Sequence, residues 1–301
     1  MNLYYTPAQR EQLRLRMGLA GVAGSGKTFT AITLAQALSP DGRFAVIDTT
    51  GRAAQYADTF GFGLVRPRRA DPAELPEMIA YADHEGYGAL VIDSWSHYWS
   101  GAGGALDRVD QLADKRSAWA SYRPVETAMM DAIRCFSGHI ILTLRVHTHY
   151  AQSETADGTV RTTRLGTRPD QREWVDYEMD LYAEIDEQHT LSVFKTACPA
   201  LVDARLPRPG VELAETLREW LGQGVAVPTL MDLTRKALDP ATTWEQLRGV
   251  RDLAVQRQLM DGWVVDERGM AVQFSNLVTR LGRQRRPAAP PAAESPAPVG
   301  G

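Results

Sequence analysis

The run GVAGSGKT at residues 21–28 is the feature that most limits the possible folds of this chain. It matches the pattern G-x-x-x-x-G-K-[ST] at every fixed position, and such a loop wraps the phosphate tail of a nucleotide. Its glycines can adopt positive φ angles and turn backbone N–H groups into one concavity, and the N-terminus of the following helix adds positive potential there. We expect Lys27 to reach the β- and γ-phosphates and the Thr28 hydroxyl to hold Mg²⁺. The expected nucleotide contacts are Gly21, Val22, Ala23, Gly24, Ser25, Gly26, Lys27, Thr28 and Phe29.

The segments on either side of this loop have the periodicity that it requires. Before it, Leu13, Leu15, Met17 and Leu19 recur at every second position, which is the period of a β-strand. After it, residues 29–38 contain neither glycine nor proline and have the composition of a helix. This strand–loop–helix setting favours a true phosphate-binding loop over a chance octapeptide in a surface loop.

A second element typical of phosphate-transferring enzymes lies at residues 89–93, where four apolar residues precede Asp93. A carboxylate at the C-terminal end of a buried strand can hold Mg²⁺ beside Thr28. An acid that merely ends a strand is the alternative, but the presence of the loop upstream favours the magnesium role. No guanine-specifying N-K-x-D run is present, so ATP is preferred over GTP. We therefore expect ATP and Mg²⁺ as cofactors, with Thr28 and Asp93 as the metal ligands.

Composition excludes several classes of protein. A chain of 301 residues can bury one substantial core and a small second unit. The formal net charge of −4 gives no global basic field, so any contact with nucleic acid must come from local patches. Two cysteines, Cys135 and Cys198, are too few for a disulfide framework, and no Cys/His set has zinc spacing. Because no stretch has the apolar length of a membrane span and the N-terminus lacks a signal-peptide core, we expect a cytoplasmic protein without membrane contact.

Short apolar runs alternate with helical patterns from about residue 12 to residue 221, which predicts an α/β fold with a mostly parallel sheet covered by helices. A long helical stretch is expected between residues 105 and 137. The pair Asp157-Gly158 and a turn at residues 186–189 predict hairpins, and therefore antiparallel additions to the sheet. The expected buried strands are residues 43–48, 89–93 and 139–145.

The chain divides into three parts by composition. We expect residues 1–224 to form the α/β core. Residues 225–285 are expected to form a small helical C-terminal region, because apolar residues recur at spacings of three and four between Leu230 and Leu281. Residues 286–301 are rich in proline and alanine and cannot bury apolar surface, so we expect a disordered tail.

Taken together, these segments resemble the RecA-like P-loop ATPases of phages, a group that includes single-strand annealing partners of phage recombination. The resemblance spans about residues 13–221 in the family's order. It implies a RecA-like P-loop core, Mg²⁺-dependent ATP hydrolysis, action on single-stranded DNA in recombination or replication, and a homo-oligomer. It also implies phage recombination or replication proteins as partners, in the host cytoplasm. The segments that carry it are residues 21–28, 43–58, 87–97, 139–150 and 168–198.

The resemblance also assigns roles to residues beyond the loop. The family's magnesium-linked acid falls on Asp93, and its sensor-like strand end falls near Arg145, His147 and His149, with Tyr150 close behind. For the two histidines, an ordinary solvated strand end is the alternative.

Two positions depart from the family pattern. The strand before the first turn commonly runs I-D-x-E, and its Glu orients the attacking water, but Thr50 stands at that position here. A hydroxyl can hydrogen-bond a water but cannot accept its proton at neutral pH, so we expect slow turnover. Asp48 could compensate only if it faces the γ-phosphate.

The second departure concerns a K-x-R pair that, in hexameric relatives, reaches across to the neighbour's nucleotide. Here Lys195 is kept and Ala197 replaces the arginine. An ordinary exposed strand residue is the alternative for Lys195. The residues that we expect to act in catalysis are Lys27, Thr50, Asp93, Arg145 and Lys195.

Local basic and aromatic clusters are candidates for contact with DNA. Four arginines cluster around the hairpin and loop expected between Asp157 and Glu173, a Gly- and Thr-rich segment long enough to be mobile, where they would follow a phosphate backbone. A solubilising surface loop is the alternative. Trp95, Tyr98 and Trp99 could stack on bases, although aromatic residues at a strand-to-helix junction more often pack under the sheet. The four arginines are Arg161, Arg164, Arg168 and Arg172.

The motifs predict a Mg²⁺-dependent ATPase, and the resemblance implies that it is RecA-like and acts on single-stranded DNA. One rival is a nucleotide-binding switch that hydrolyses little because of Thr50. Another is a small-molecule kinase, against which the later RecA-like strands and the absence of an obvious lid argue.

Overall fold

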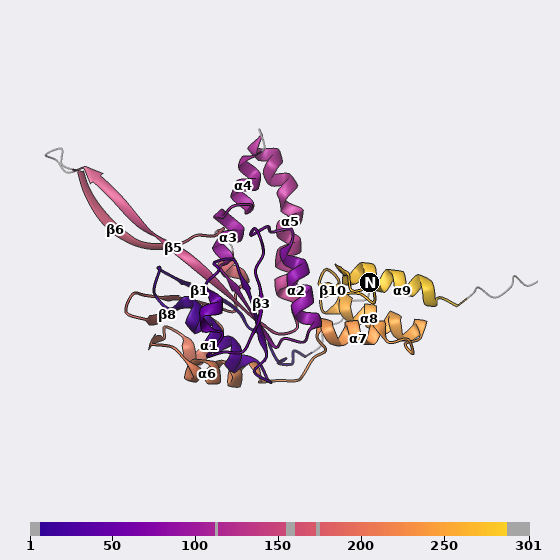
Figure 1. Cartoon of the computed structure of the whole chain (residues 1–301). Helices are drawn as coiled ribbons and strands as arrows, with labels where there is room; N and C mark the ends of the chain where they lie inside the picture. Colours follow the sequence, from indigo (N-terminus) through magenta and orange to yellow (C-terminus); the bar gives the residue numbers. More distant parts are fainter. Residues whose placement is uncertain (1–6, 112–113, 155–159, 173–174, 288–301) are drawn as a thin grey trace, which may run out of the picture.

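The computed structural model describes residues 7–111, 114–154, 160–172 and 175–287. Within these ranges a mixed nine-stranded sheet forms the centre of the molecule (Figure 1), in the order β3-β2-β4-β5-β1-β7-β8-β9, with β6 paired to β5. The strands are β1 (Arg16–Gly21), β2 (Phe44–Asp48), β3 (Gly63–Val65), β4 (Ala89–Asp93), β5 (His139–Glu154), β6 (Val160–Pro169), β7 (Leu181–Ile185), β8 (Thr190–Thr196) and β9 (Arg205–Pro207).

The pairing confirms the predicted α/β sheet with antiparallel additions. β1 is parallel to both β5 and β7, and β2 is parallel to β3 and β4. The later pairs β5–β6, β7–β8 and β8–β9 are antiparallel. Because parallel strands carry their carboxyl ends to one edge of a sheet, the ends of β1, β2 and β4 meet there, beside Arg145 in the middle of β5.

Helices cover the sheet on both faces and bury the central strands completely. One face packs against α1 (Lys27–Leu38) and α6 (Val211–Leu221). The other packs against α2 (Leu75–His84), α3 (Trp95–Ser100) and α5 (Lys115–Cys135), while α4 (Ala105–Asp110) packs on α5. The expected helix at residues 105–137 is thus two helices.

β1 begins with a buried arginine whose guanidinium is satisfied by backbone carbonyls. The alternation that begins at Leu13 predicts a strand from that point, but the strand starts at Arg16, and Leu13 is 38% exposed. Arg16 is buried because its guanidinium donates to the backbone carbonyls of Arg134, Phe136 and Gly138. Burial lowers the pKa of Arg16 to about 10.

The aromatic residues that follow β4 belong to the core. Trp95 and Tyr98 are buried against the sheet, and Trp99 stacks on Trp119 with ring centroids 5.8 Å apart. The first two rings are therefore inaccessible to bases, which confirms the packing alternative for them.

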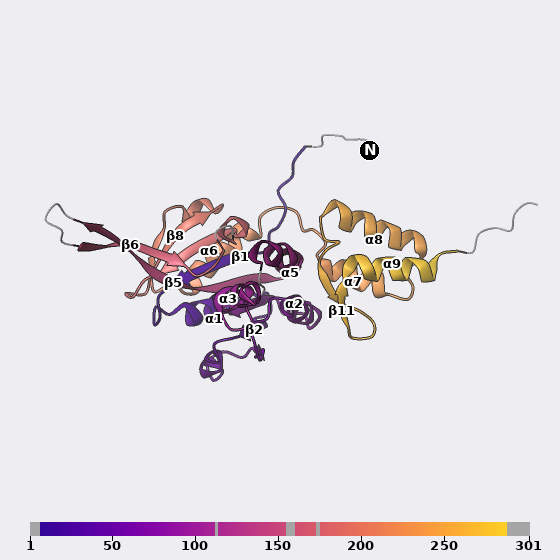
Figure 2. The ribbon, with the colours of Figure 1, turned by 90° about the horizontal axis from the view of Figure 1, so that it is seen from above.

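Residues 230–285 form a C-terminal unit beside the core (Figure 2). It contains α7 (Leu230–Leu238), α8 (Trp244–Gln256), β10 (Trp263–Val265), β11 (Ala271–Gln273) and α9 (Phe274–Arg285), with an apolar core of its own. The three helices confirm the helical appendage that the sequence predicts, and β10 and β11 add a short hairpin to it. Asp266 closes that hairpin by accepting hydrogen bonds from the backbone N–H groups of Arg268 and Met270.

The C-terminal unit is joined to the core by packing and by polar contacts. β10 packs against α2, and the Ser137 hydroxyl donates to buried Asp83 while it accepts from the N–H of Met231. Burial raises the pKa of the Asp83 carboxyl to about 7.

Strands β5 and β6 continue beyond the sheet as a two-stranded arm that projects from the body at the end opposite the C-terminal unit (Figures 1 and 2). Pairing runs from Val146–Pro169 to Glu154–Val160. This antiparallel pairing agrees with the hairpin that the sequence predicts here, and residues 160–169 of the Gly- and Thr-rich segment form β6. The predicted turn at Asp157-Gly158 lies outside the described residues. In the part of the chain that is described, no helix is long and apolar enough to cross a membrane.

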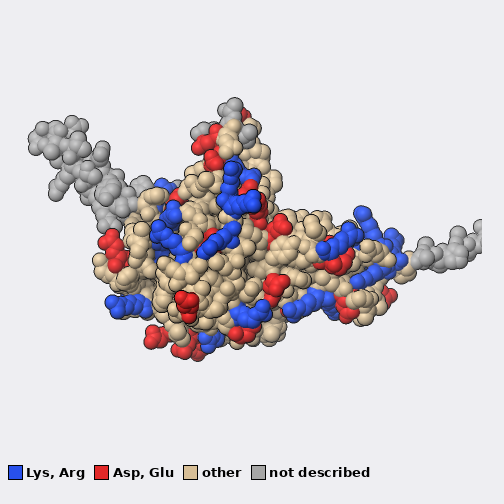
Figure 3. All heavy atoms as spheres, in the orientation of Figure 1, with Lys and Arg blue, Asp and Glu red and all other residues tan. Residues whose placement is uncertain are grey.

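On the face shown in Figure 3, acidic and basic side chains are interspersed over the surface of the core. Neither charge dominates this face. This mixture agrees with the small formal net charge of −4. On this face, a site for a polyanion must therefore be local.

Candidate functional site

The phosphate-binding loop joins β1 to α1 with the backbone that its sequence predicts. Gly24 and Gly26 have φ angles of 79° and 92°, in the left-handed region that favours glycine. Gly21 passes so close to the end of β7 that an added Cβ would lie 2.4 Å from the Ile185 carbonyl oxygen. No side chain caps the start of α1, so the first N–H groups of the helix remain for an anion.

Lys27 lies within the loop and contacts it. Its Nζ donates to the carbonyl of Val22 at 2.6 Å. Burial lowers the pKa of the Lys27 ammonium, and Asp93 opposes this shift. A triphosphate tail in the loop would offer this ammonium stronger acceptors than a single carbonyl.

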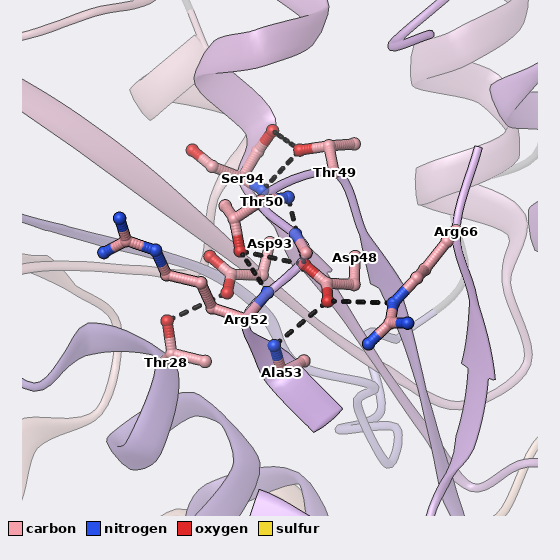
Figure 4. A network of polar contacts seen from close by, with 10 residues as sticks. Thr28, Asp48, Thr49, Thr50, Arg52, Ala53, Arg66, Asp93 and Ser94 are labelled. Carbon is pink, nitrogen blue, oxygen red and sulfur yellow. Dashed lines mark hydrogen bonds and ion pairs between the residues drawn. The ribbon is translucent and has the colours of Figure 1, made fainter. Parts of the chain in front are cut away.

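Asp93 faces the loop from the end of β4 (Figure 4). Its Oδ2 accepts a hydrogen bond from the Thr28 hydroxyl at 2.8 Å, and its Oδ1 accepts one from Thr143 on β5 at 2.5 Å. A hydroxyl and a carboxylate within hydrogen-bond distance are the oxygen donors that Mg²⁺ takes beside a nucleotide. The residues present therefore fit the expected ion, with Thr28 and Asp93 as the groups that would hold it.

These elements surround a cavity of about 470 Å³ at the carboxyl ends of the strands. Its lining combines the loop with polar and basic residues from β2, β4 and β5, so the site is suited to a polyanion. The lining residues are Gly21, Ala23, Gly24, Lys27, Thr28, Thr49, Thr50, Arg52, Asp93, Ser94, His97, Arg145, Val146 and His147.

A comparison with protein families agrees with this geometry. Residues 13–206 match the model of an AAA domain, which is most of the chain. The chain belongs to the AAA domain family. Membership supports nucleotide binding and ATPase activity for this P-loop fold. No curated protein sequence matches the chain significantly.

Within this AAA domain, Asp48 and Thr50 occupy the turn that follows β2 (Figure 4). Asp48 is 2% exposed and does not line the cavity. Its Oδ1 accepts from the N–H groups of Thr50 and Gly51 and from the Thr50 hydroxyl, and its Oδ2 accepts from the N–H of Ala53. Asp48 therefore organises the turn, and this geometry argues against its role as a compensating base.

Of the other residues predicted to act in catalysis or sensing, some line the cavity and one does not. Arg145 is exposed and lines the cavity, as does His147, whose Nε2 lies 3.5 Å from Asp170. Lys195 is not among the lining residues of its own chain, and its Nζ donates to the carbonyls of Asp176 and Tyr177.

Two further predicted groups make local contacts. Phe29 follows the loop, is 47% exposed and makes edge contacts with the rings of Tyr56 and Phe60. Arg172 pairs with Glu126 and lies over the Trp119 ring, so it is tied to α5.

Several cavity residues of the AAA domain escape sequence reasoning. Thr49, Arg52 and His97 line the cavity, and Thr143 touches Asp93. His189, in the turn between β7 and β8, supports the loop through its Nδ1, 3.0 Å from the Ser25 carbonyl. Of these residues, only His97 could have been suspected from the sequence, because it follows Asp93 of the second motif by four residues.

Proposed function

We propose that this AAA domain is a RecA-like ATPase that binds ATP with Mg²⁺ and hydrolyses it slowly. The observation that carries the proposal is the contact of Thr28 with Asp93 at the mouth of a loop in phosphate-binding conformation. Lys27 and Arg145 would stabilise the charge that develops on the γ-phosphate. When bound, Mg²⁺ would neutralise charge on the β- and γ-phosphates.

Slow hydrolysis is expected because no carboxylate base stands at the position of Thr50. Thr50 lines the cavity but cannot accept a proton, and Asp48 is engaged by the turn. A positioned general base contributes about two to four orders of magnitude in rate. A nucleotide-binding switch that barely hydrolyses ATP is therefore a second candidate, and Thr50 is the observation that favours it.

Single-stranded DNA is the proposed macromolecular partner. The β5–β6 arm starts at the cavity, since Arg145, Val146 and His147 of β5 line it, and β6 carries Arg161 and Arg164. A DNA strand on the arm would thus lie beside a segment that also meets the nucleotide. Arg172 is not part of this proposal because Glu126 and Trp119 hold it.

The test is steady-state ATP turnover of the full chain with and without single-stranded DNA, together with DNA binding over a range of salt concentrations. The proposal expects slow turnover that DNA stimulates. Replacing Arg161 and Arg164 by alanine should weaken DNA binding and reduce the log–log salt slope by about 0.7 for each phosphate that the variant no longer neutralises. Nucleotide binding with negligible turnover in either condition would favour the switch, and DNA-indifferent turnover would favour a small-molecule kinase.

Assembly is a separate part of the proposal. RecA-like domains form oligomers in which a late-strand cation reaches the neighbour's nucleotide, so Lys195 would act on the nucleotide of an adjacent subunit. Mass measurement in solution with and without ATP tests this, because a persistent monomer at working concentration would leave Lys195 without a nucleotide to contact.

A further inference from the structure

His97 is the one neutral base at the cavity that makes no ion pair among the described residues. It lies in α3, four residues beyond Asp93, and its half-buried ring lines the cavity. Its Nδ1 lies 2.7 Å from the Thr49 hydroxyl. The ring is therefore held at one nitrogen in the wall of the cavity that the phosphate-binding loop also lines.

The contacts of Thr49 favour one of the two tautomers of the His97 ring. The Thr49 hydroxyl accepts from the Ser94 N–H at 2.9 Å and lies 3.3 Å from the Ser94 carbonyl oxygen. A hydroxyl can donate one hydrogen bond and accept two. All three contacts are satisfied when Thr49 donates to the Ser94 carbonyl and accepts from Nδ1–H of His97. In that tautomer, Nε2 carries the lone pair.

Burial favours the neutral form of this imidazole. Burial lowers the pKa of His97, and Arg145 adds to the shift, whereas Asp93 and Asp170 oppose it. His147 lines the same cavity but lies against Asp170.

The other acceptors at the site are committed elsewhere. Both oxygens of Asp93 accept hydrogen bonds from threonine hydroxyls, and Asp48 holds the turn. Thr50 donates its only hydroxyl proton to Asp48. The position that a glutamate occupies in related enzymes thus offers no proton acceptor here, while Nε2 of His97 does.

We propose that His97 is the general base of this ATPase, an inference that rests on the proposed ATP hydrolysis. The water oxygen attacks the γ-phosphorus, and the bond from that phosphorus to the β–γ bridging oxygen breaks, with its electron pair leaving on ADP. The water proton moves to Nε2 of His97, and the resulting imidazolium returns it to solvent. Thr49 is a positioning residue that holds the ring through Nδ1.

The experiment measures ATP turnover of the full chain between pH 5 and 8, and ATP affinity with a fluorescent ATP analogue. In the wild type, turnover should fall below about pH 6.5, since protonated His97 cannot accept a proton and its pKa lies below that ordinary value. His97→Gln should lower turnover at pH 7.5 by about 100-fold or more, remove the acid limb and leave ATP affinity within about twofold.

Two further variants separate this role from a structural one. Thr49→Val should reduce turnover and shift the acid limb to lower pH, because it removes the hydroxyl that accepts from Nδ1–H of His97, a contact that favours the charged ring. His84→Gln, on the exposed face of α2 and away from the cavity, is the matched control and should match the wild type.

Several results would overturn the proposal. Full turnover in His97→Gln would do so, as would an acid limb that disappears in His147→Gln instead, or ATP binding without any turnover in the wild type. If His97→Gln does not fold, an unaltered rate and pH profile in Thr49→Val overturns the proposal instead. A wild type that fails to bind ATP would contradict the proposed function itself, which separates the two failures.

Discussion

Replacing Asp48 by asparagine tests whether this buried carboxylate shapes the turn or serves the chemistry. Its two oxygens accept from three backbone N–H groups and one hydroxyl, at 2.8–3.0 Å. In Asp48→Asn one oxygen becomes an NH₂ group. If the amide keeps its oxygen on the side with three donors, the NH₂ group meets the N–H of Ala53, a residue that is fully buried.

The magnitude follows from this count. An unsatisfied buried N–H costs about 1–3 kcal/mol, and the three remaining hydrogen bonds lose their charge assistance, which adds about 1 kcal/mol. The ion pair with Arg66 contributes little, because its Nε lies 3.7 Å away and its side chain is 51% exposed. We expect Asp48→Asn to lower the free energy of unfolding by about 2–4 kcal/mol.

Urea unfolding followed by tryptophan fluorescence measures the loss, with Asp186→Asn as the matched control. Asp186 is exposed and accepts from the N–H groups of Gln188 and Thr190 through one oxygen, which an asparagine retains. The control should change stability by less than about 0.5 kcal/mol. An Asp48→Asn variant with unaltered stability but turnover reduced about 100-fold would refute the reasoning and make Asp48 the base.

The remaining predictions concern the nucleotide site. Lys27→Ala should weaken ATP binding about 10- to 100-fold, the equivalent of one charge-assisted hydrogen bond, while thermal unfolding without nucleotide stays unchanged; equal affinity in a folded variant would contradict the loop assignment. Asp93→Asn should reduce turnover about 100-fold and affinity far less, whereas a loss confined to nucleotide-free stability would show a structural acid. Thr50→Glu should raise turnover above that of the wild type, and in the His97→Gln background it should restore part of the lost rate. A rate that Thr50→Glu leaves unchanged or abolishes would mean that residue 50 does not face the water.

The fold and the phosphate site follow from local sequence. The glycines of the loop motif allow its backbone conformation, and a helix follows the motif directly. The apolar runs before Asp48 and Asp93 are long enough to be buried strands. Both features depend on neighbours in the chain, so a sequence displays them. The hairpin of the C-terminal unit is different, because strands of three residues within helix-like apolar spacing carry no clear period.

The parts of the site that sequence reasoning misses are set by contacts over long separations. Thr143 meets Asp93 across 50 positions of the chain, and His189 meets Ser25 across 164. The role proposed for His97 depends on its contact with Thr49, which follows β2 and lies beside α3. Arg16 is similar, since a charged residue reads as exposed until the carbonyls that bury it are known. Such pairings require the strand order, which no local pattern contains.

One continuous strand, β5, is both a wall of the cavity and half of the projecting arm. From Val146 to Glu154 it pairs only with β6 among the described strands, a length of about 30 Å at 3.3 Å per residue. Rotation of its base by about 5° would sweep the far end through about 2–3 Å at that length. Because Arg145 at the base of the arm lines the cavity, a small rotation of β5 there would produce a larger displacement at Glu154.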